Sequence, residues 1–163
     1  MTEIKILSLK LYELLKDKNI MISTAESCTG GLIGKTLTDI PGISAHYGYG
    51  FITYSNEAKQ NLLGVKKETL ESFGAVSSET VKEMATGALL KSGSDVAVSV
   101  SGIAGPGGGS EEKPVGLVYI GIKSKENDGK SHRFIFDGTR DEVRLKTVKK
   151  SIELVIEEIE NIR

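Results

Sequence analysis

A serine and a cysteine stand side by side in a turn rich in groups that could do chemistry. Ser27 and Cys28 lie within residues 24–31 (TAESCTGG), after an apolar run at residues 20–22 and before a helical pattern that begins at Leu32. A turn from a strand into a helix presents backbone N–H groups and the positive end of a helix dipole, where an oxyanion can be bound. We therefore expect Ser27 or Cys28 to act as a nucleophile, with the amides of residues 29–31 as oxyanion donors.

A serine nucleophile needs a group that accepts its proton. The chain has two histidines, His46 and His132, and both are best interpreted as solvated surface side chains. Lys59 could serve instead, as in Ser–Lys hydrolases, because it lies near the start of a predicted helix whose dipole would lower its pKa. Glu57 in the same turn would raise that pKa. On spacing alone, a solvated helix lysine is the more common outcome.

The residues of the turn also have structural interpretations. Cys28 at a helix N-terminus could carry a lowered pKa, or it could be a small buried apolar side chain. Ser27 could simply cap the following helix. Glu26 could orient a base, bind a substrate hydroxyl, or accept hydrogen bonds from nearby backbone N–H groups.

A second candidate site follows the most apolar predicted strand. Residues 101–114 form a long glycine-rich segment that opens with Ser101 and Gly102. Ligands of α/β proteins bind at such strand ends, and glycines let backbone N–H groups approach a phosphate or a carboxylate. Arg140 opens the last helix and could clamp a phosphate, or it could be a surface arginine beside Asp141.

Two nucleotide-binding motifs are excluded. Residues 30–36 end like a P-loop, but Thr29 stands where that motif requires glycine. The dinucleotide fingerprint G-x-G-x-x-G does not occur in either glycine cluster. The sequence therefore does not predict a nucleoside triphosphatase or a Rossmann dinucleotide site.

The periodicity of apolar residues predicts the elements that position these groups. Helices that alternate with strands in the first part and a late hairpin indicate an α/β fold: a three-layer α/β/α sandwich with a mixed central sheet, in one domain spanning residues 1–163. We expect helices at residues 3–18, 32–39, 56–63, 66–73, 79–91 and 139–159, and strands at 20–25, 47–54, 96–100, 116–123 and 133–136.

Composition limits the partners. The formal net charge is -1 and the pI is about 6.2, so we expect no direct contact with nucleic acid. No apolar run approaches the roughly 20 residues of a membrane span, and the N-terminus lacks a signal-peptide pattern. With a single cysteine, these features predict a cytoplasmic protein. Two histidines and one cysteine are too few for a typical His/Cys metal cluster, so we expect no metal.

Four motifs together resemble the C-terminal domain of the CinA family. They are residues 24–31 (TAESCTGG), 54–59 (YSNEAK), 74–77 (GAVS), and 101–106 (SGIAGP) with 113–116 (KPVG), in the order of the family. Stand-alone members of that family are nicotinamide-nucleotide amidohydrolases. The resemblance implies hydrolysis of the carboxamide of nicotinamide mononucleotide to nicotinic acid mononucleotide and ammonia, in pyridine-nucleotide salvage and without a cofactor.

The resemblance also implies a role for each matching residue. Ser27 resembles the nucleophile, which favours it over Cys28. Lys59 resembles its general base, which reverses the interpretation as a solvated lysine, and Tyr54 resembles a supporting group in the same network. The resemblance also implies that the subunits associate, so we expect a homodimer or a higher homo-oligomer. The resemblance places Ser101 near the reacting centre and Arg140 on the 5′-phosphate. The expected substrate-binding residues are Glu26, Thr29, Gly30, Gly31, Ser101, Gly102 and Arg140.

Three alternatives stay open. The chain could be a non-catalytic module that binds pyridine nucleotides or phosphate. It could be an interaction protein related to competence or DNA damage. It could also hydrolyse a different amide in the same pocket, because pocket chemistry does not fix the identity of a substrate.

Overall fold

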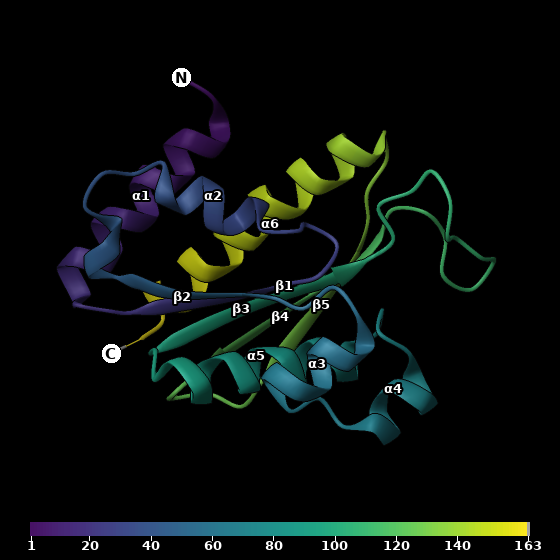
Figure 1. Ribbon diagram of the computed structural model, residues 1–163. Helices are drawn as coiled ribbons and strands as arrows, with labels where there is room; N and C mark the ends of the chain where they lie inside the picture. The colour runs from purple at the N-terminus through teal and green to yellow at the C-terminus, as the bar shows by residue number, and fades with distance from the viewer. Residues whose placement is uncertain (163) are drawn as a thin grey trace.

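The predicted α/β/α sandwich is confirmed by the computed structural model, which describes residues 1–162 (Figure 1). A central sheet is covered on one face by α1, α2 and α6 and on the other by α3, α4 and α5. The elements are α1 (Glu3–Lys18), β1 (Ile22–Glu26), α2 (Leu32–Thr38), the short 3-10 helix η1 (Ile43–Ala45), β2 (Tyr47–Ile52), α3 (Asn56–Leu63), α4 (Lys67–Phe73), α5 (Ser78–Ser92), β3 (Val96–Gly102), β4 (Leu117–Ser124), β5 (Lys130–Ile135) and α6 (Arg140–Glu160).

The sheet is mixed, with strand order β2-β1-β3-β4-β5. Strands β2, β1 and β3 are parallel, and β4 and β5 form the antiparallel hairpin. Glu26 at the end of β1 pairs with Ile52 of β2 and Val100 of β3. The carboxyl ends of three parallel strands therefore lie side by side, which brings together the segments that follow them.

Residue size along the strands sets how closely the helices approach. Towards α1 and α6, the strands present branched apolar side chains such as Val98 and Ile120. Towards α5 they present small residues: Ser99 donates a hydrogen bond to the Val81 carbonyl (2.6 Å), and a Cβ atom at Gly121 would lie 2.5 Å from the same oxygen. Helix α5 can pack this close only because these positions carry almost no side chain.

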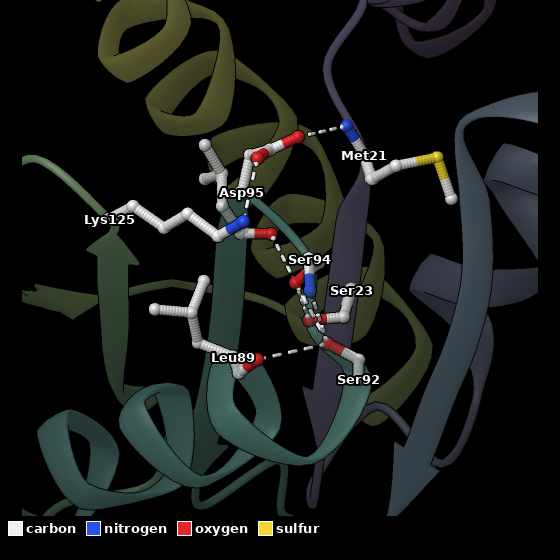
Figure 2. Close-up of polar contacts among 8 residues, drawn as sticks. Met21, Ser23, Leu89, Ser92, Ser94, Asp95 and Lys125 are labelled. Atoms are coloured by element: carbon white, nitrogen blue, oxygen red, sulfur yellow. Dashed lines mark hydrogen bonds and ion pairs between the residues drawn. The ribbon is translucent and has the colours of Figure 1, made fainter.

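A polar network fixes the opposite end of the sheet (Figure 2). The Asp95 carboxylate accepts from the Met21 amide (2.8 Å) and pairs with Lys125 (3.2 Å). The hydroxyls of Ser23 and Ser94 lie 2.8 Å apart. These contacts join the starts of β1 and β3 and so help to set the register of the two strands. Ser27 follows β1 at the other end of this pair.

The predicted starts of two strands differ from the structure by two or more residues, and strands β2 and β3 end at Ile52 and Gly102 rather than at residues 54 and 100. Strand β1 begins at Ile22 rather than at residue 20, because Asn19 ends α1 in the left-handed region (φ 53°) and the chain must turn before pairing. Strand β5 begins at Lys130 rather than at residue 133, since residues 130–135 all pair with β4. Within residues 1–162, no helix is long and apolar enough to cross a membrane.

Candidate active site

Ser27 and Lys59 meet at the carboxyl end of the parallel strands. Ser27 directly follows β1, and Lys59 lies in α3, whose start is capped by the Ser55 hydroxyl on the Ala58 amide (3.0 Å). The Lys59 Nζ atom lies 3.0 Å from Ser27 Oγ. Ser27 is 7% exposed and Lys59 is 1% exposed. The pair therefore forms a buried dyad, and the expectation of a solvated helix lysine, drawn from spacing alone, is wrong.

The surroundings of the Lys59 amine suit a proton acceptor. Its Nζ also donates to the backbone carbonyls of Thr53 (3.0 Å) and Tyr54 (3.2 Å). A neutral amine has two N–H bonds, which these carbonyls can accept, and one lone pair, which then faces the hydroxyl of Ser27. Loss of hydration on burial lowers the pKa of Lys59, and the nearby Cys28 opposes this weakly.

Carboxylates do not stabilise the charged form of this lysine. Across residues 1–162, no carboxylate lies within ion-pair distance of the Lys59 amine. Burial is the main cause of the lowered pKa of Lys59. A lysine whose pKa is lowered loses its proton more readily, and its neutral amine can accept the proton of a serine.

Cys28 has the opposite character. Its side chain is 7% exposed and packs in the core beneath α2 and α6. Burial raises the pKa of the thiol to about 12, so the thiolate is strongly disfavoured. Ser27 is not a helix cap either, because Gly31 is the N-cap of α2 and the Ser27 hydroxyl contacts Lys59. The geometry favours Ser27 over Cys28 as the nucleophile.

Glu26 binds the protein itself. Its buried carboxylate accepts from Thr29 Oγ1 (2.6 Å), the Ile33 amide (2.8 Å) and the Gly34 amide (3.0 Å). This occupies both carboxylate oxygens and places a negative charge at the start of α2. These contacts match the structural role expected for Glu26, as an acceptor of hydrogen bonds from nearby backbone N–H groups.

The amides of the turn are partly occupied as well. The Gly30 amide donates to the Ser27 carbonyl (3.1 Å), which closes the turn. Gly31 faces Ile52, whose side chain would lie 3.1 Å from a Cβ atom at that position. The Gly30 contact removes that amide from the oxyanion donors expected at residues 29–31, and we take the amides of Cys28 and Thr29, which directly follow Ser27, as the candidates.

A cavity of about 280 Å³ opens onto the dyad. Six of the predicted site residues line it: Ser27, Lys59, Tyr54, Ser101, Gly102 and Arg140. Four others, Glu26, Thr29, Gly30 and Gly31, do not line it; they shape the turn behind it. The complete lining is Ser27, Cys28, Tyr54, Asn56, Lys59, Ala75, Val76, Ser101, Gly102, Ile103, Ala104, Gly105, Gly107, Gly108 and Arg140.

The mouth of the cavity carries a positive charge. Arg140 donates to the Gly105 carbonyl (2.8 Å) and to the Tyr54 hydroxyl (3.3 Å). The Tyr54 side chain is 62% exposed, so this residue supports Lys59 through its carbonyl and supports Arg140 through its phenol. Arg140 joins two walls of the cavity and leaves a cation where the anionic end of a ligand could bind.

Two lining or supporting residues were not singled out from the sequence. Asn56 lines the cavity at the first position of α3, inside the motif that also contains Lys59. Arg144 follows Arg140 by four residues, one helical turn, and donates from Nε to the Cys28 carbonyl (2.9 Å). That spacing is the signal that could have placed Arg144 near the site.

The histidines have no part in the cavity. His46 is 8% exposed, and its Nδ1 lies 3.0 Å from the Ile20 carbonyl, so the expectation of a solvated surface residue is wrong for it. His132 is partly buried on β5 beside Phe134. Within residues 1–162, no three His, Cys, Asp or Glu side chains form a group that could hold a metal ion.

Known proteins are similar to this chain in sequence and in fold. The sequence profile of the CinA C-terminal domain matches residues 5–159. The chain belongs to the CinA C-terminal domain family. Over 152 residues it is 51% identical to the nicotinamide-nucleotide amidohydrolase PncC of Enterobacter agglomerans, covering 93% of each chain. The family assignment made from the four motifs is therefore confirmed.

Solved structures of the family superpose closely on the chain. The competence/damage inducible protein CihA from Agrobacterium tumefaciens is 47% identical, with a TM-score of 0.93 and 96% of each chain covered. A CinA superfamily protein from Klebsiella pneumoniae is 33% identical, with a TM-score of 0.94.

Other relatives are longer. A CinA-like protein of Endomicrobium trichonymphae is 55% identical over 142 residues, which are 87% of this chain and 33% of that protein. The chain spans about a third of the length of several curated relatives that it matches.

Proposed function

We propose that the protein hydrolyses the carboxamide of nicotinamide mononucleotide to nicotinic acid mononucleotide and ammonia, with Ser27 as nucleophile and Lys59 as general base. The observation that carries the proposal is the buried 3.0 Å contact between Lys59 Nζ and Ser27 Oγ, with two carbonyls on the other side of the amine. The substrate follows from the likeness to PncC, which is named a nicotinamide-nucleotide amidohydrolase.

The dyad can carry both halves of an acyl transfer. Neutral Lys59 takes the Ser27 proton as Oγ attacks the carboxamide carbon, and the amides of Cys28 and Thr29 stabilise the oxyanion. Protonated Lys59 then gives its proton to the leaving nitrogen, which departs as ammonia. Water, activated by the same amine, attacks the acyl ester and releases the carboxylic acid and free Ser27.

The cavity supports recognition of a mononucleotide. We place the reacting carboxamide at the dyad beside Ser101, and the 5′-phosphate at the mouth, on Arg140. The phenol of Tyr54 holds the Arg140 guanidinium in position. The same proposal includes a role in pyridine-nucleotide salvage in the cytoplasm, and assembly of the protein as a homodimer or a higher homo-oligomer.

The test is ammonia release from nicotinamide mononucleotide, with the acid product identified by chromatography. We expect activity in the wild type and in Cys28→Ala, and a loss of several orders of magnitude in Ser27→Ala. Cys28→Ala is the matched control because it changes the adjacent side chain in the same turn. A folded wild type that binds the mononucleotide without turnover would instead support a binding module.

A further inference from the structure

The turn that carries Ser27 is held from two sides by buried or partly buried charges. On one side, the Glu26 carboxylate binds Thr29 and the first amides of α2. On the other side, Arg144 of α6 donates from Nε to the Cys28 carbonyl at 2.9 Å. The two charged groups reach the turn from different layers of the fold, and neither lines the cavity.

We propose that Arg144 is a positioning residue for catalysis, which orients the peptide unit between Cys28 and Thr29 so that its N–H group faces the oxyanion formed at Ser27. The inference rests on the proposed function, because it takes Ser27 as the nucleophile. Arg144 acts through a backbone group and does not touch the substrate.

The geometry explains why this peptide unit needs an external partner. Gly30 and Gly31, which follow it, have φ values of 59° and 105°, a region that glycine adopts at little cost. The flexible segment is tied back by the Gly30 amide on the Ser27 carbonyl. Orientation of the Cys28 carbonyl is left to Arg144, whose terminal nitrogen also lies 4.0 Å from the Cβ position of Gly30.

Charge strengthens the effect of position. A hydrogen bond from a guanidinium polarises the peptide unit that accepts it, so the Thr29 N–H at the other end becomes a better donor. The positive charge also acts on the turn directly: it lowers the pKa of the Cys28 thiol, although burial raises that pKa by more. The same field favours negative charge on the oxygen atoms that form at Ser27.

The experiment measures Ser27 reactivity without the amide substrate. A small sulfonyl fluoride labels activated serines, and the rate of labelling is followed by intact-protein mass spectrometry. We expect Arg144→Met to label about tenfold to a hundredfold more slowly than the wild type, the range for loss of one hydrogen bond to a charged group. With nicotinamide mononucleotide, kcat should fall by a similar factor while KM stays within about twofold.

Lys146→Met is the matched control. Lys146 lies on the same helix and also donates to a backbone carbonyl, that of Asp137 (2.6 Å), away from the cavity. We expect wild-type labelling and kcat in this variant. Arg144→Lys retains the charge but not the planar fork, and should recover only part of the rate. It also serves as the second variant if Arg144→Met does not fold.

The outcomes separate the two proposals. An unlabelled wild-type Ser27 contradicts the proposed function and removes the basis for a role of Arg144. A labelled wild type with equally fast labelling of folded Arg144→Met and Arg144→Lys overturns the inference alone. Equal losses in the Arg144 and Lys146 variants would also overturn it, because they would show a general effect of α6 on stability.

Discussion

Replacement of Lys59 by methionine removes the base and keeps most of the buried side-chain volume. Methionine has an unbranched apolar chain that fills the path of the lysine stem from α3 towards Ser27. The Thr53 and Tyr54 carbonyls lose their donor, but the cost of burying an amine at 1% exposure disappears with it. The substitution therefore separates the chemical role of Lys59 from its contribution to folding.

The size of the effect follows from these contacts. General base catalysis contributes about 10²–10⁴-fold to a rate, and Lys59 also protonates the leaving nitrogen, so we expect kcat to fall by about 10³–10⁴-fold. At about 1.36 kcal/mol per factor of ten, this equals about 4–5.4 kcal/mol of transition-state stabilisation. Two lost carbonyl contacts cost about 1–3 kcal/mol each, against the relief of the buried amine, so the midpoint of thermal unfolding should shift by only a few degrees.

The assay is ammonia release by Ser27→Ala, Lys59→Met and the double variant, beside thermal unfolding. Residues that act as one unit give non-additive losses, so the double variant should be no slower than the slower single variant. Lys67→Met, at a lysine whose side chain is 71% exposed, is the control that should keep full activity. A folded Lys59→Met variant that retains more than about a tenth of wild-type kcat would refute the reasoning.

Three further predictions concern protonation and the cavity mouth. Because the pKa of Lys59 is lowered, a pH–rate profile should show kcat/KM rising with pH to a plateau, and the midpoint of this rise should lie below the ordinary lysine pKa of 10.5. A midpoint at or above 10.5 would contradict the effect of burial on Lys59. The unfolded chain binds the Lys59 proton more tightly, so wild-type stability relative to Lys59→Met should increase as pH rises towards 10.5 and reach its full value above it; chemical denaturation at several pH values tests the sign. Arg140→Met should raise KM for nicotinamide mononucleotide at least tenfold. Nicotinamide riboside has no phosphate, so we expect the wild type to turn it over much more slowly and Arg140→Met to leave that rate unchanged. Equal losses for both substrates would contradict a contact between Arg140 and the phosphate.

Local patterns predicted the elements well because local interactions decide them. A capping box at Thr139 begins α6, and the Ser55 and Ser77 hydroxyls cap α3 and α5. The strand boundaries were less accurate, because pairing partners determine where a strand begins. Strand β5 extends to Lys130 only through its pairing with Ile122.

The candidate site was predictable in part. The family resemblance pointed to Ser27, Lys59 and Arg140, and the structure brings all three to one cavity. Spacing alone could not place Lys59 beside Ser27, since the two are 32 residues apart and meet only through the parallel pairing of β1 and β2.

Side-chain partners from tertiary packing decided the remaining cases. Glu26 was compatible with three roles in the sequence, and its contacts with Thr29 and the amides of α2 select one of them. His46 is buried because its ring reaches the Ile20 carbonyl, a contact that no local pattern shows. Arg144 donates a hydrogen bond to the Cys28 carbonyl, which lies 116 residues earlier in the chain.

Ser27 forms an acyl-enzyme in the proposed reaction, and partitioning of that intermediate between water and hydroxylamine is the decisive measurement. Hydroxylamine competes with water for an acyl ester and yields a hydroxamate in place of the acid. With nicotinamide mononucleotide as substrate, the account predicts that the wild type forms the hydroxamate of nicotinic acid mononucleotide in increasing proportion as hydroxylamine is raised, and that Ser27→Ala forms none. Formation of the acid alone at every hydroxylamine concentration, with ammonia release persisting in Ser27→Ala, would contradict it.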